Sequence, residues 1–414
     1  MALRIIHTAD WHLGQLFFGY DRDAEQEAFL SWLAEMLAER EADVLLIAGD
    51  VFDVANPSAA AQRRFYHFLK EANRLNPGLQ ILVIAGNHDS AVRLEAPNPL
   101  FEEFHTRVVG NIRRKADGTV DFDALLCPLC DRSGHRAAWC LAVPFLRQGD
   151  YPAPEEIPDT YVAGVGRLYR QLYAYAAARR QPGEALLAMG HLHASGAQLS
   201  HDDRSERVIM GGLESVSIDV FDAGLVYTAL GHIHKAQQVG GVEKIRYAGS
   251  PLPMSFSETH YRHQVVEVRL DGSGPVVIDS LAIPQTVPLW RIPEGGAAAP
   301  DEVLASLAAL PETTDRERDF WPFLEVRVLL TEPDPGFRHR VEEVLETKAV
   351  RLTSIVPVYP ERPTSEQAGS LSYGDLQRID PLDMLQHAFE QKYGSDLPEE
   401  IAGLFKEVVR EVTV

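Results

Sequence analysis

The sequence has little cysteine, no long apolar run and no excess of basic residues. Its three cysteines among 414 residues argue against a disulfide framework and predict a reducing compartment. The most apolar runs, at 44–48 and 81–85, have the length of strands and are far too short to cross a bilayer. The first ten residues lack the basic and apolar segments of a secretion signal. We therefore expect a cytoplasmic protein.

The charge balance is strongly acidic, with a formal net charge of -21. This acidity argues against tight, sequence-independent DNA binding by the chain alone, because such proteins usually carry a basic face. It does not exclude a nucleic-acid substrate, since bound metal ions or a partner subunit can supply positive charge. The length predicts two or three domains, and 45% hydrophobic residues are enough for a sizeable core.

The first two thirds of the chain alternate short apolar runs with helical patterns. The expected helices lie at 23–40, 58–75 and 160–180. The expected strands lie at 3–6, 43–48, 79–85, 186–189, 226–230, 245–248, 265–270 and 276–283, with a hairpin at 125–145. The strand–helix alternation before residue 85 predicts a layered α/β fold. We expect the strands after residue 125 to complete a second sheet packed on the first.

The composition shifts to Pro, Gly and Ala at 284–300, which predicts a linker. A small α+β unit is expected after it, with helices at 301–309 and 336–347 and strands at 323–330 and 350–358. A second linker at 360–370 precedes two expected helices, at 373–392 and 398–412. The sequence thus predicts three domains, with the ranges 1–285, 286–360 and 361–414.

Polar motifs follow five of the expected strands. They are Asp10-Trp11-His12, Gly49-Asp50-Val51-Phe52-Asp53, Gly86-Asn87-His88-Asp89, Gly190-His191-Leu192-His193 and Gly231-His232-Ile233-His234. Loops at the carboxyl ends of strands line the active sites of α/β sheets. Residues two apart in an extended chain point to the same side, as expected of Asp10 with His12 and of His232 with His234.

The side chains of these motifs have the chemistry of metal ligands. Carboxylate, carboxamide and imidazole groups bind borderline divalent ions such as manganese, iron and zinc. There are more of them than one ion needs, and with Asp50 as a bridge they suit two ions about 3.5–4 Å apart. Two such ions would carry more charge than Asp10 and Asp50 cancel. The centre would therefore attract phosphate inside an acidic protein.

The motifs DxH, GDxxD, GNHD, GH and GHxH, in this order, resemble the calcineurin-like metallophosphoesterase family. The segments HTADWHLGQ, IAGDVFD, IAGNHDS, VPFLR and YAGSPLPMSF are similar to the SbcD-type nucleases within the double-strand-break repair group. The resemblance is strong over about the first 285 residues and weaker beyond them. It implies a two-sheet sandwich flanked by helices, a small α+β capping domain and a C-terminal helical tail.

The resemblance also implies the roles of single residues. One metal ion would be held by Asp10, His12, Asp50 and His234. The other ion would be held by Asp50, Asn87, His191 and His232. His88 would lie over the phosphate and stabilise the transition state or protonate the leaving oxygen. Asp53 matches a position that orients this histidine in some members, whereas other nucleases of the group carry histidine there. His193 is expected beside the site without being a ligand.

The function implied by the resemblance is a metal-dependent DNA nuclease of DNA repair and recombination. It would act as an exonuclease on duplex ends and as an endonuclease on hairpin or single-stranded DNA, with manganese as the working metal. A homodimer formed through helices of the first domain would assemble with an SbcC-type coiled-coil ATPase into a heterotetramer. The apolar stripe Leu382, Leu385 and Phe389 would dock on that ATPase, although the same pattern is also typical of a helix that completes a core.

Simpler interpretations compete at each motif. Asp10, Asp50 and Asn87 have side chains that often form turns or cap helices at strand ends. Histidines after strands are often plain loop or interior residues, and for His7 we expect the interior role. A phosphatase or small-molecule phosphodiesterase of the same fold is the alternative function. A metal-free scaffold would be expected to lack ligands, whereas every expected ligand position is filled.

The three cysteines form a second candidate metal site. Cys127, Cys130, His135 and Cys140 have the spacing of a retroviral-type zinc knuckle, a module that binds single-stranded nucleic acid. Against this interpretation, the segment lies in the expected hairpin and lacks the aromatic residue that such knuckles place just after the first cysteine. The spacing alone leaves the zinc site open.

Overall fold

The computed structural model describes most of the chain before residue 361 and short pieces after it. The described residues are 3–152, 161–198, 215–271, 275–313, 318–360, 382, 385–386, 389–390, 396–398 and 401–406. They form two compact units. The first contains 3–290, 313–325 and 349–354, and the second contains 291–312, 326–348 and the described residues from 355 onward. The tail helices expected at 373–392 and 398–412 lie largely outside the described residues, and the domain limits at 285 and 360 stay predictions.

The first sheet has six strands in the order β14-β13-β1-β4-β5-β6. Its strands are β1 (Leu3–Thr8), β4 (Val44–Ala48), β5 (Gln80–Ile84), β6 (Thr106–Val109), β13 (Gln264–Leu270) and β14 (Val277–Ala282). The strands β1, β4, β5 and β6 run parallel, and β13 pairs antiparallel with β1. The expectation that 265–270 and 276–283 complete the second sheet is therefore wrong. Apolar runs fit either sheet equally well, and only pairing with β1 decides between them.

The second sheet also has six strands, in the order β11-β12-β10-β9-β8-β7. Its strands are β7 (Leu126–Cys130), β8 (Arg136–Ala142), β9 (Ala185–His191), β10 (Tyr227–Gly231), β11 (Gln237–Val239) and β12 (Val242–Tyr247). The hairpin expected at 125–145 is confirmed as β7 and β8, which pair antiparallel. The strands β8, β9, β10 and β12 run parallel.

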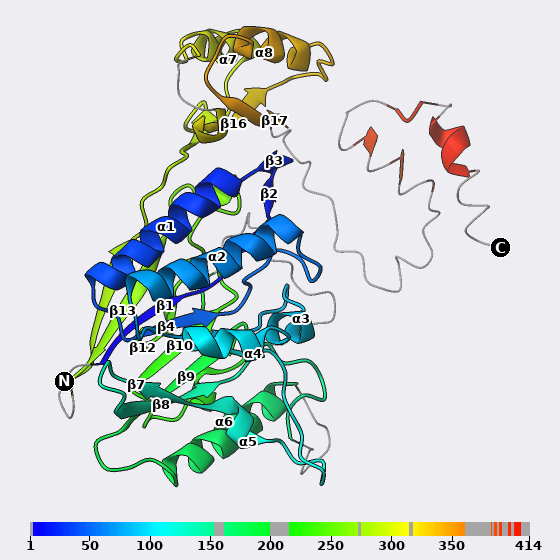
Figure 1. Cartoon of the computed structure of the whole chain (residues 1–414). Helices are drawn as coiled ribbons and strands as arrows, with labels where there is room; N and C mark the ends of the chain where they lie inside the picture. Colours follow the sequence, from blue (N-terminus) through cyan, green and yellow to red (C-terminus); the bar gives the residue numbers. More distant parts are fainter. Residues whose placement is uncertain are drawn as a thin grey trace. The chain divides into compact units, whose positions relative to one another are not determined.

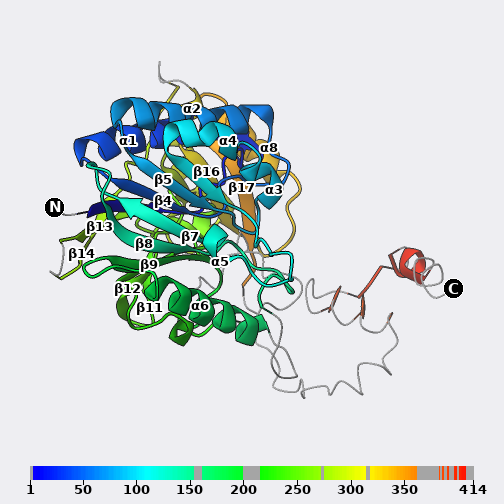
Figure 2. The ribbon, with the colours of Figure 1, turned by 60° about the horizontal axis from the view of Figure 1, so that its bottom comes forward.

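The two sheets pack face to face between helices, an α/β/β/α arrangement visible in Figures 1 and 2. Helices α1 (Asp23–Glu39) and α2 (Ala59–Leu75) cover the first sheet, and α6 (Tyr161–Ala177) covers the second. Successive residues of a strand point to opposite faces. Thus Leu45 lies in one core together with the helix residue Phe65, and Leu46 lies in the other together with Leu187 of the second sheet.

Shorter elements connect these layers. They are β2 (Leu16–Phe17), β3 (Tyr20–Asp21), α3 (Ala91–Glu95), α4 (Asn98–Phe101), α5 (Phe122–Leu125) and the 3₁₀ turns η1 (Glu102–Phe104), η2 (Ile218–Val220) and η3 (Phe256–Glu258). Within the described residues, no helix is both long enough and apolar enough to cross a membrane.

A three-stranded sheet in the order β15-β16-β17 forms the later part of the described chain. It contains β15 (Leu289–Ile292), β16 (Phe323–Leu329) and β17 (Arg351–Val358), and the chain between them carries α7 (Pro300–Ala308), η4 (Arg318–Phe320) and α8 (Phe337–Leu345). The linker expected at 284–300 is wrong in part, because it contains β15. The Pro and Gly residues on both sides of these four residues favoured a linker. Their strand conformation depends on pairing with β16, which the local sequence does not indicate.

Candidate metal centre

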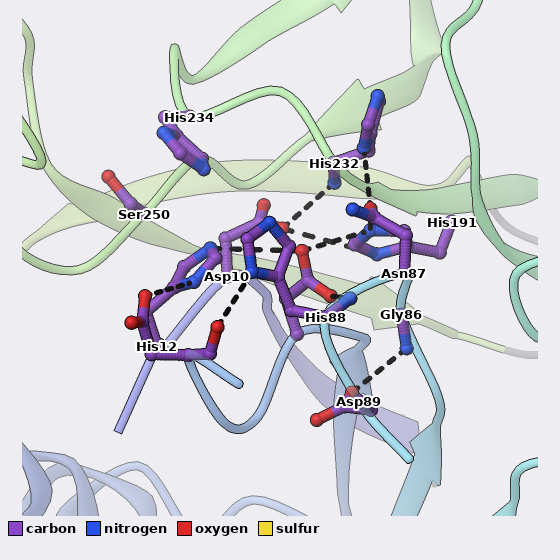
Figure 3. Close-up of polar contacts among 12 residues, drawn as sticks. Asp10, His12, Gly86, Asn87, His88, Asp89, His191, His232, His234 and Ser250 are labelled. Carbon is purple, nitrogen blue, oxygen red and sulfur yellow. Dashed lines mark hydrogen bonds and ion pairs between the residues drawn. The ribbon is translucent and has the colours of Figure 1, made fainter. Parts of the chain in front are cut away.

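Five loops bring the polar motifs together at one edge of the sandwich (Figure 3). The loops follow β1, β4 and β5 of the first sheet and β9 and β10 of the second. Within each sheet these strands are parallel, so their carboxyl ends meet at the same edge. The structure thus brings together side chains separated by more than two hundred residues in the sequence.

Asp10, His12 and His234 form the first group of candidate ligands. One ligand atom of each residue lies within 4.8 Å of the others. The imidazole rings of His12 and His234 lie 5.2 Å apart between centroids. All three side chains are buried. This group can hold one cation through a carboxylate and two imidazoles.

Asn87, His191 and His232 form the second group. The Oδ1 atom of Asn87 lies 2.9 Å from Nε2 of His191 and 2.9 Å from Nδ1 of His232. The rings of His191 and His232 lie 5.3 Å apart. An amide oxygen and two imidazole nitrogens therefore face one another across a small space.

The carboxylate of Asp50 lies between the two groups. Its Oδ2 atom is 3.7 Å from Nε2 of His12 and 3.3 Å from Nε2 of His191. Its Oδ1 atom accepts a hydrogen bond of 2.8 Å from the main-chain N–H of His88. A single oxygen of Asp50 thus contacts a histidine of each group.

The residues fit a bound cation, because the site contains buried polar atoms that the described protein does not satisfy. Asp10 Oδ2 and His12 Nε2 are buried and have no hydrogen-bond partner among the described residues. Leaving such an atom unpaired costs about 1–3 kcal/mol. Asp10, His12, Asp50 and His232 also have positive φ angles of 55, 46, 49 and 105°. Strained backbone of this kind is typical of functional sites.

Comparison with known proteins agrees with this geometry. Residues 3–236 match the family model described as calcineurin-like phosphoesterase, and residues 285–393 match that of the type 5 capsule protein repressor C-terminal domain. The chain is 39% identical to the SbcD subunit of the nuclease SbcCD from Rhodobacter capsulatus, over 94% of both chains. It is 31% identical to the SbcD subunit from Escherichia coli K12, over 84% of both chains. With that of Bacillus subtilis it shares 28% identity over 99% of this chain and 98% of the relative.

The chain belongs to the SbcD family of calcineurin-like phosphoesterases. The family resemblance and the two-sheet α/β fold expected from the motifs are therefore confirmed. As a member of this family, the chain is a metal-dependent hydrolase of phosphodiester bonds and a nuclease, and its centre binds divalent metal.

Electrostatics at the family's metal centre depend on Asp50. Burial acts to raise the pKa of Asp50, but the combined attraction of His191, His12 and His88 outweighs it and holds that pKa well below the usual range. Burial acts to lower the pKa of His191, and Asp50 in turn raises it to about 9. Burial lowers the pKa of His232 to about 3, so this imidazole stays neutral and able to ligate. A divalent cation bound here would replace the His191 proton beside Asp50.

Two glycines leave the space that these ligands occupy. A Cβ atom on Gly86 would overlap the carboxylate and main-chain nitrogen of Asp50, and one on Gly49 would overlap the imidazole of His191. Gly49 also has a φ of 90°, which favours glycine. Only glycine therefore allows the two strand ends to approach this closely.

We expect Gly86→Ala to displace Asp50, weaken metal binding and destabilise the fold by about 1–3 kcal/mol, the usual cost of overpacking. Manganese binding by calorimetry and the midpoint of thermal unfolding measure the two effects. The matched control is Gly295→Ala, since a Cβ there meets nothing within 4 Å. Unchanged manganese affinity in Gly86→Ala would contradict the close packing of Gly86 on Asp50.

The imidazole of His88 contacts the main chain of Asp53. The His88 Nδ1 atom lies 2.7 Å from the carbonyl oxygen of Asp53. The Asp53 carboxylate instead lies 3.3 Å from Nδ1 of His12. In this structure the main chain of Asp53 orients His88, and its side chain contacts a candidate ligand. The spacing of the motifs could not reveal this, because any residue at position 53 offers the same carbonyl.

Asp89 was not predicted from the sequence, although it lies in the GNHD motif. The buried carboxylate of Asp89 accepts hydrogen bonds from the main-chain N–H groups of Val51, Phe52 and Gly86, at 3.2, 3.0 and 2.9 Å. It thereby fixes the loops that carry Asp50 and Asn87. Burial, with repulsion by Asp50, raises the pKa of Asp89 to about 6. Its position directly after Asn87 and His88, which both had assigned roles, was the available signal.

Two other histidines lie near the centre without joining a ligand group. His7 is buried, and its Nδ1 atom lies 2.9 Å from the hydroxyl of Tyr227, which confirms the interior role expected of it. His193 is half-buried, and its carbonyl oxygen accepts a hydrogen bond from the N–H of Val216. Among the described residues, His193 belongs to no cluster of metal-binding side chains.

The structure does not support the zinc knuckle. Cys127 and Cys140 face each other across the β7–β8 ladder and are buried in the core. The side chain of His135 is 81% exposed at the turn between these strands. In the described chain, none of the four residues joins a metal-binding cluster. Burial raises the pKa of Cys127 to about 11, so this thiol stays protonated.

Proposed function

We propose that this chain cleaves DNA at a two-metal centre as the nuclease subunit of an SbcCD-type complex. The observation that carries the proposal is that Asp50 contacts a histidine of each of the two ligand groups. One ion would be held by Asp10, His12, Asp50 and His234. The other would be held by Asp50, Asn87, His191 and His232. Manganese suits this mixture of carboxylate, amide and imidazole ligands.

The ions, when bound, supply Lewis acidity that activates water and neutralises charge on the phosphate. The protein supplies the proton chemistry through His88. Because the carbonyl oxygen of Asp53 can only accept, Nδ1 of His88 must carry a hydrogen. That leaves Nε2 of His88 to face the substrate, where its protonated form donates to the leaving oxygen. Asp53 thus orients His88 through its carbonyl oxygen, and its carboxylate lies 3.3 Å from Nδ1 of His12.

The wider assembly follows from what the relatives are named, as subunits of a nuclease complex. The proposed partner is an SbcC-type coiled-coil ATPase, docked by the tail 361–414 after the capping domain 286–360. The proposed assembly is a heterotetramer built on a homodimer. Exonuclease action on duplex ends and endonuclease action on hairpins or single strands, in cytoplasmic DNA repair and recombination, complete the proposal.

The proposal is tested by following linear duplex DNA and a phosphate monoester side by side. We expect manganese-dependent loss of DNA, an intact monoester, and no cleavage after a chelator has removed the metal. Adding manganese back should restore cleavage, because the ligands lie on a preformed fold.

Rapid hydrolysis of the monoester with intact DNA would instead identify a phosphatase. If the chain alone is inactive on both substrates, the assay is repeated with an SbcC-type ATPase and ATP. Inactivity in that complex would contradict the nuclease proposal.

A further inference from the structure

A fully buried carboxylate lies directly against one of the candidate ligands. The side chain of Glu258, at the end of η3, is 0% exposed. Its Oε1 atom lies 3.4 Å from Nδ1 of His234. Its Oε2 atom accepts a hydrogen bond of 2.9 Å from the main-chain N–H of Met254. Burying a carboxylate is costly unless it has partners. The contact with His234 is therefore a candidate for a functional interaction.

The contact has a consequence for the chemistry of the imidazole. A carboxylate oxygen accepts hydrogen bonds. The approach of Oε1 of Glu258 to 3.4 Å from Nδ1 of His234 therefore favours the tautomer with the hydrogen on Nδ1. The other nitrogen, Nε2, then holds the lone pair that a metal ion needs. In the described chain Glu258 itself belongs to no metal-binding cluster, whereas His234 forms one with Asp10 and His12.

The loop that carries Glu258 is itself held in place. The guanidinium group of Arg22 donates a hydrogen bond of 2.7 Å to the carbonyl oxygen of Pro253. Arg22 is 2% exposed and pairs with Glu25 at 2.8 Å. At the start of the loop, the N–H of Ser250 donates to the carbonyl oxygen of His234. A carboxylate anchored in this way can orient the imidazole of His234.

We propose that Glu258 is a positioning residue that holds the Nδ1–H form of His234 and presents Nε2 to the ion shared with Asp10 and His12. The inference rests on the proposed two-metal function. Carboxylate partners of ligating histidines raise the basicity of the ligand and fix its orientation, and their loss typically lowers metal affinity about 10–100-fold.

The test is a calorimetric titration of the full chain with manganese chloride. In Glu258→Ala, we expect one of the two ions to bind about 10–100-fold more weakly and the other to bind as in the wild type. The manganese affinity of Glu258→Gln should lie between those of the wild type and Glu258→Ala. Its single acceptor oxygen can serve only one of the two groups, Nδ1 of His234 or the N–H of Met254. The matched control is Glu267→Ala, which removes a carboxylate that is 2% exposed and pairs with Arg40 and Arg269.

A long-range proton–nitrogen spectrum of the metal-free chain, labelled at histidine, gives a readout that does not depend on activity. His234 should show the Nδ1–H form in the wild type and lose that preference in Glu258→Ala. Unchanged manganese affinity in Glu258→Ala, or an equal loss in Glu267→Ala, would overturn the inference. A wild-type chain that binds no manganese would overturn the two-metal function itself.

Discussion

Replacing Asp50 with alanine is expected to abolish DNA cleavage, with a loss of at least about a thousand-fold in kcat. The carboxylate contacts histidines of both ligand groups, so its removal affects both proposed ions. Metal ions contribute several kcal/mol to stabilising such transition states, and each 1.36 kcal/mol is about tenfold in rate. Cleavage of labelled duplex DNA under single-turnover conditions measures the loss.

The matched control for Asp50→Ala is Asp279→Ala, which removes a carboxylate that is 49% exposed on β14 and should keep wild-type activity. Thermal unfolding should show that Asp50→Ala still folds, because the fold depends on the two apolar cores on either side of the first sheet. Full cleavage by a folded Asp50→Ala protein would rule out a bridging role for this carboxylate.

His88→Ala is expected to lower kcat about 10²–10⁴-fold while both ions stay bound. The main-chain N–H of His88, which donates to Asp50, remains in the variant. The imidazole of His88 lies 4.8 Å from that of His12 between ring centroids and forms a possible metal cluster with His12 and Asp50, so the manganese count tests whether it ligates. This imidazole is only partly buried and is held through Nδ1. Parallel measurement of kcat and of manganese stoichiometry separates proton transfer from metal binding.

The exposed His135 offers a control histidine, and His135→Ala should change neither quantity. The assignment of His88 would be wrong if His88→Ala lost manganese together with activity, because the histidine would then act as a ligand. It would also be wrong if the variant kept its full rate. A chelated wild-type sample marks the activity expected of a protein without metal.

The fold before residue 85 could be predicted well because its signals are local. Apolar runs and helical periodicity lie within each segment and match β1, α1, β4, α2 and β5 closely. The sheet that contains β13 and β14 could not be predicted in the same way. Their apolar pattern is satisfied by either sheet, and the pairing of Leu3 with Leu270 depends on contacts far apart in the sequence.

The candidate site shows the same division. Asp10, Asp50 and the histidines could be predicted as ligands from the chemistry of their side chains and from their position after strands. Glu258 does not, because it follows a loop with no motif that links it to His234, and only the packing of that loop brings the two together. The cysteine spacing misleads for a related reason. The spacing of cysteines does not tell which way their side chains point. In the structure, Cys127 and Cys140 pair across the β7–β8 ladder and are buried in the core.

The sequence by itself determined the layered α/β class, the order of the motifs and the kinds of ligand atoms, because these depend on side-chain chemistry and local periodicity. The bridging position of Asp50 was expected from the sequence. Only the tertiary structure decided which histidine atoms Asp50 contacts, that the main chain of Asp53 orients His88, and that a buried carboxylate lies against His234. Those relations depend on how strand ends, loops and glycines pack in space. Packing is set by contacts between residues that the sequence keeps far apart.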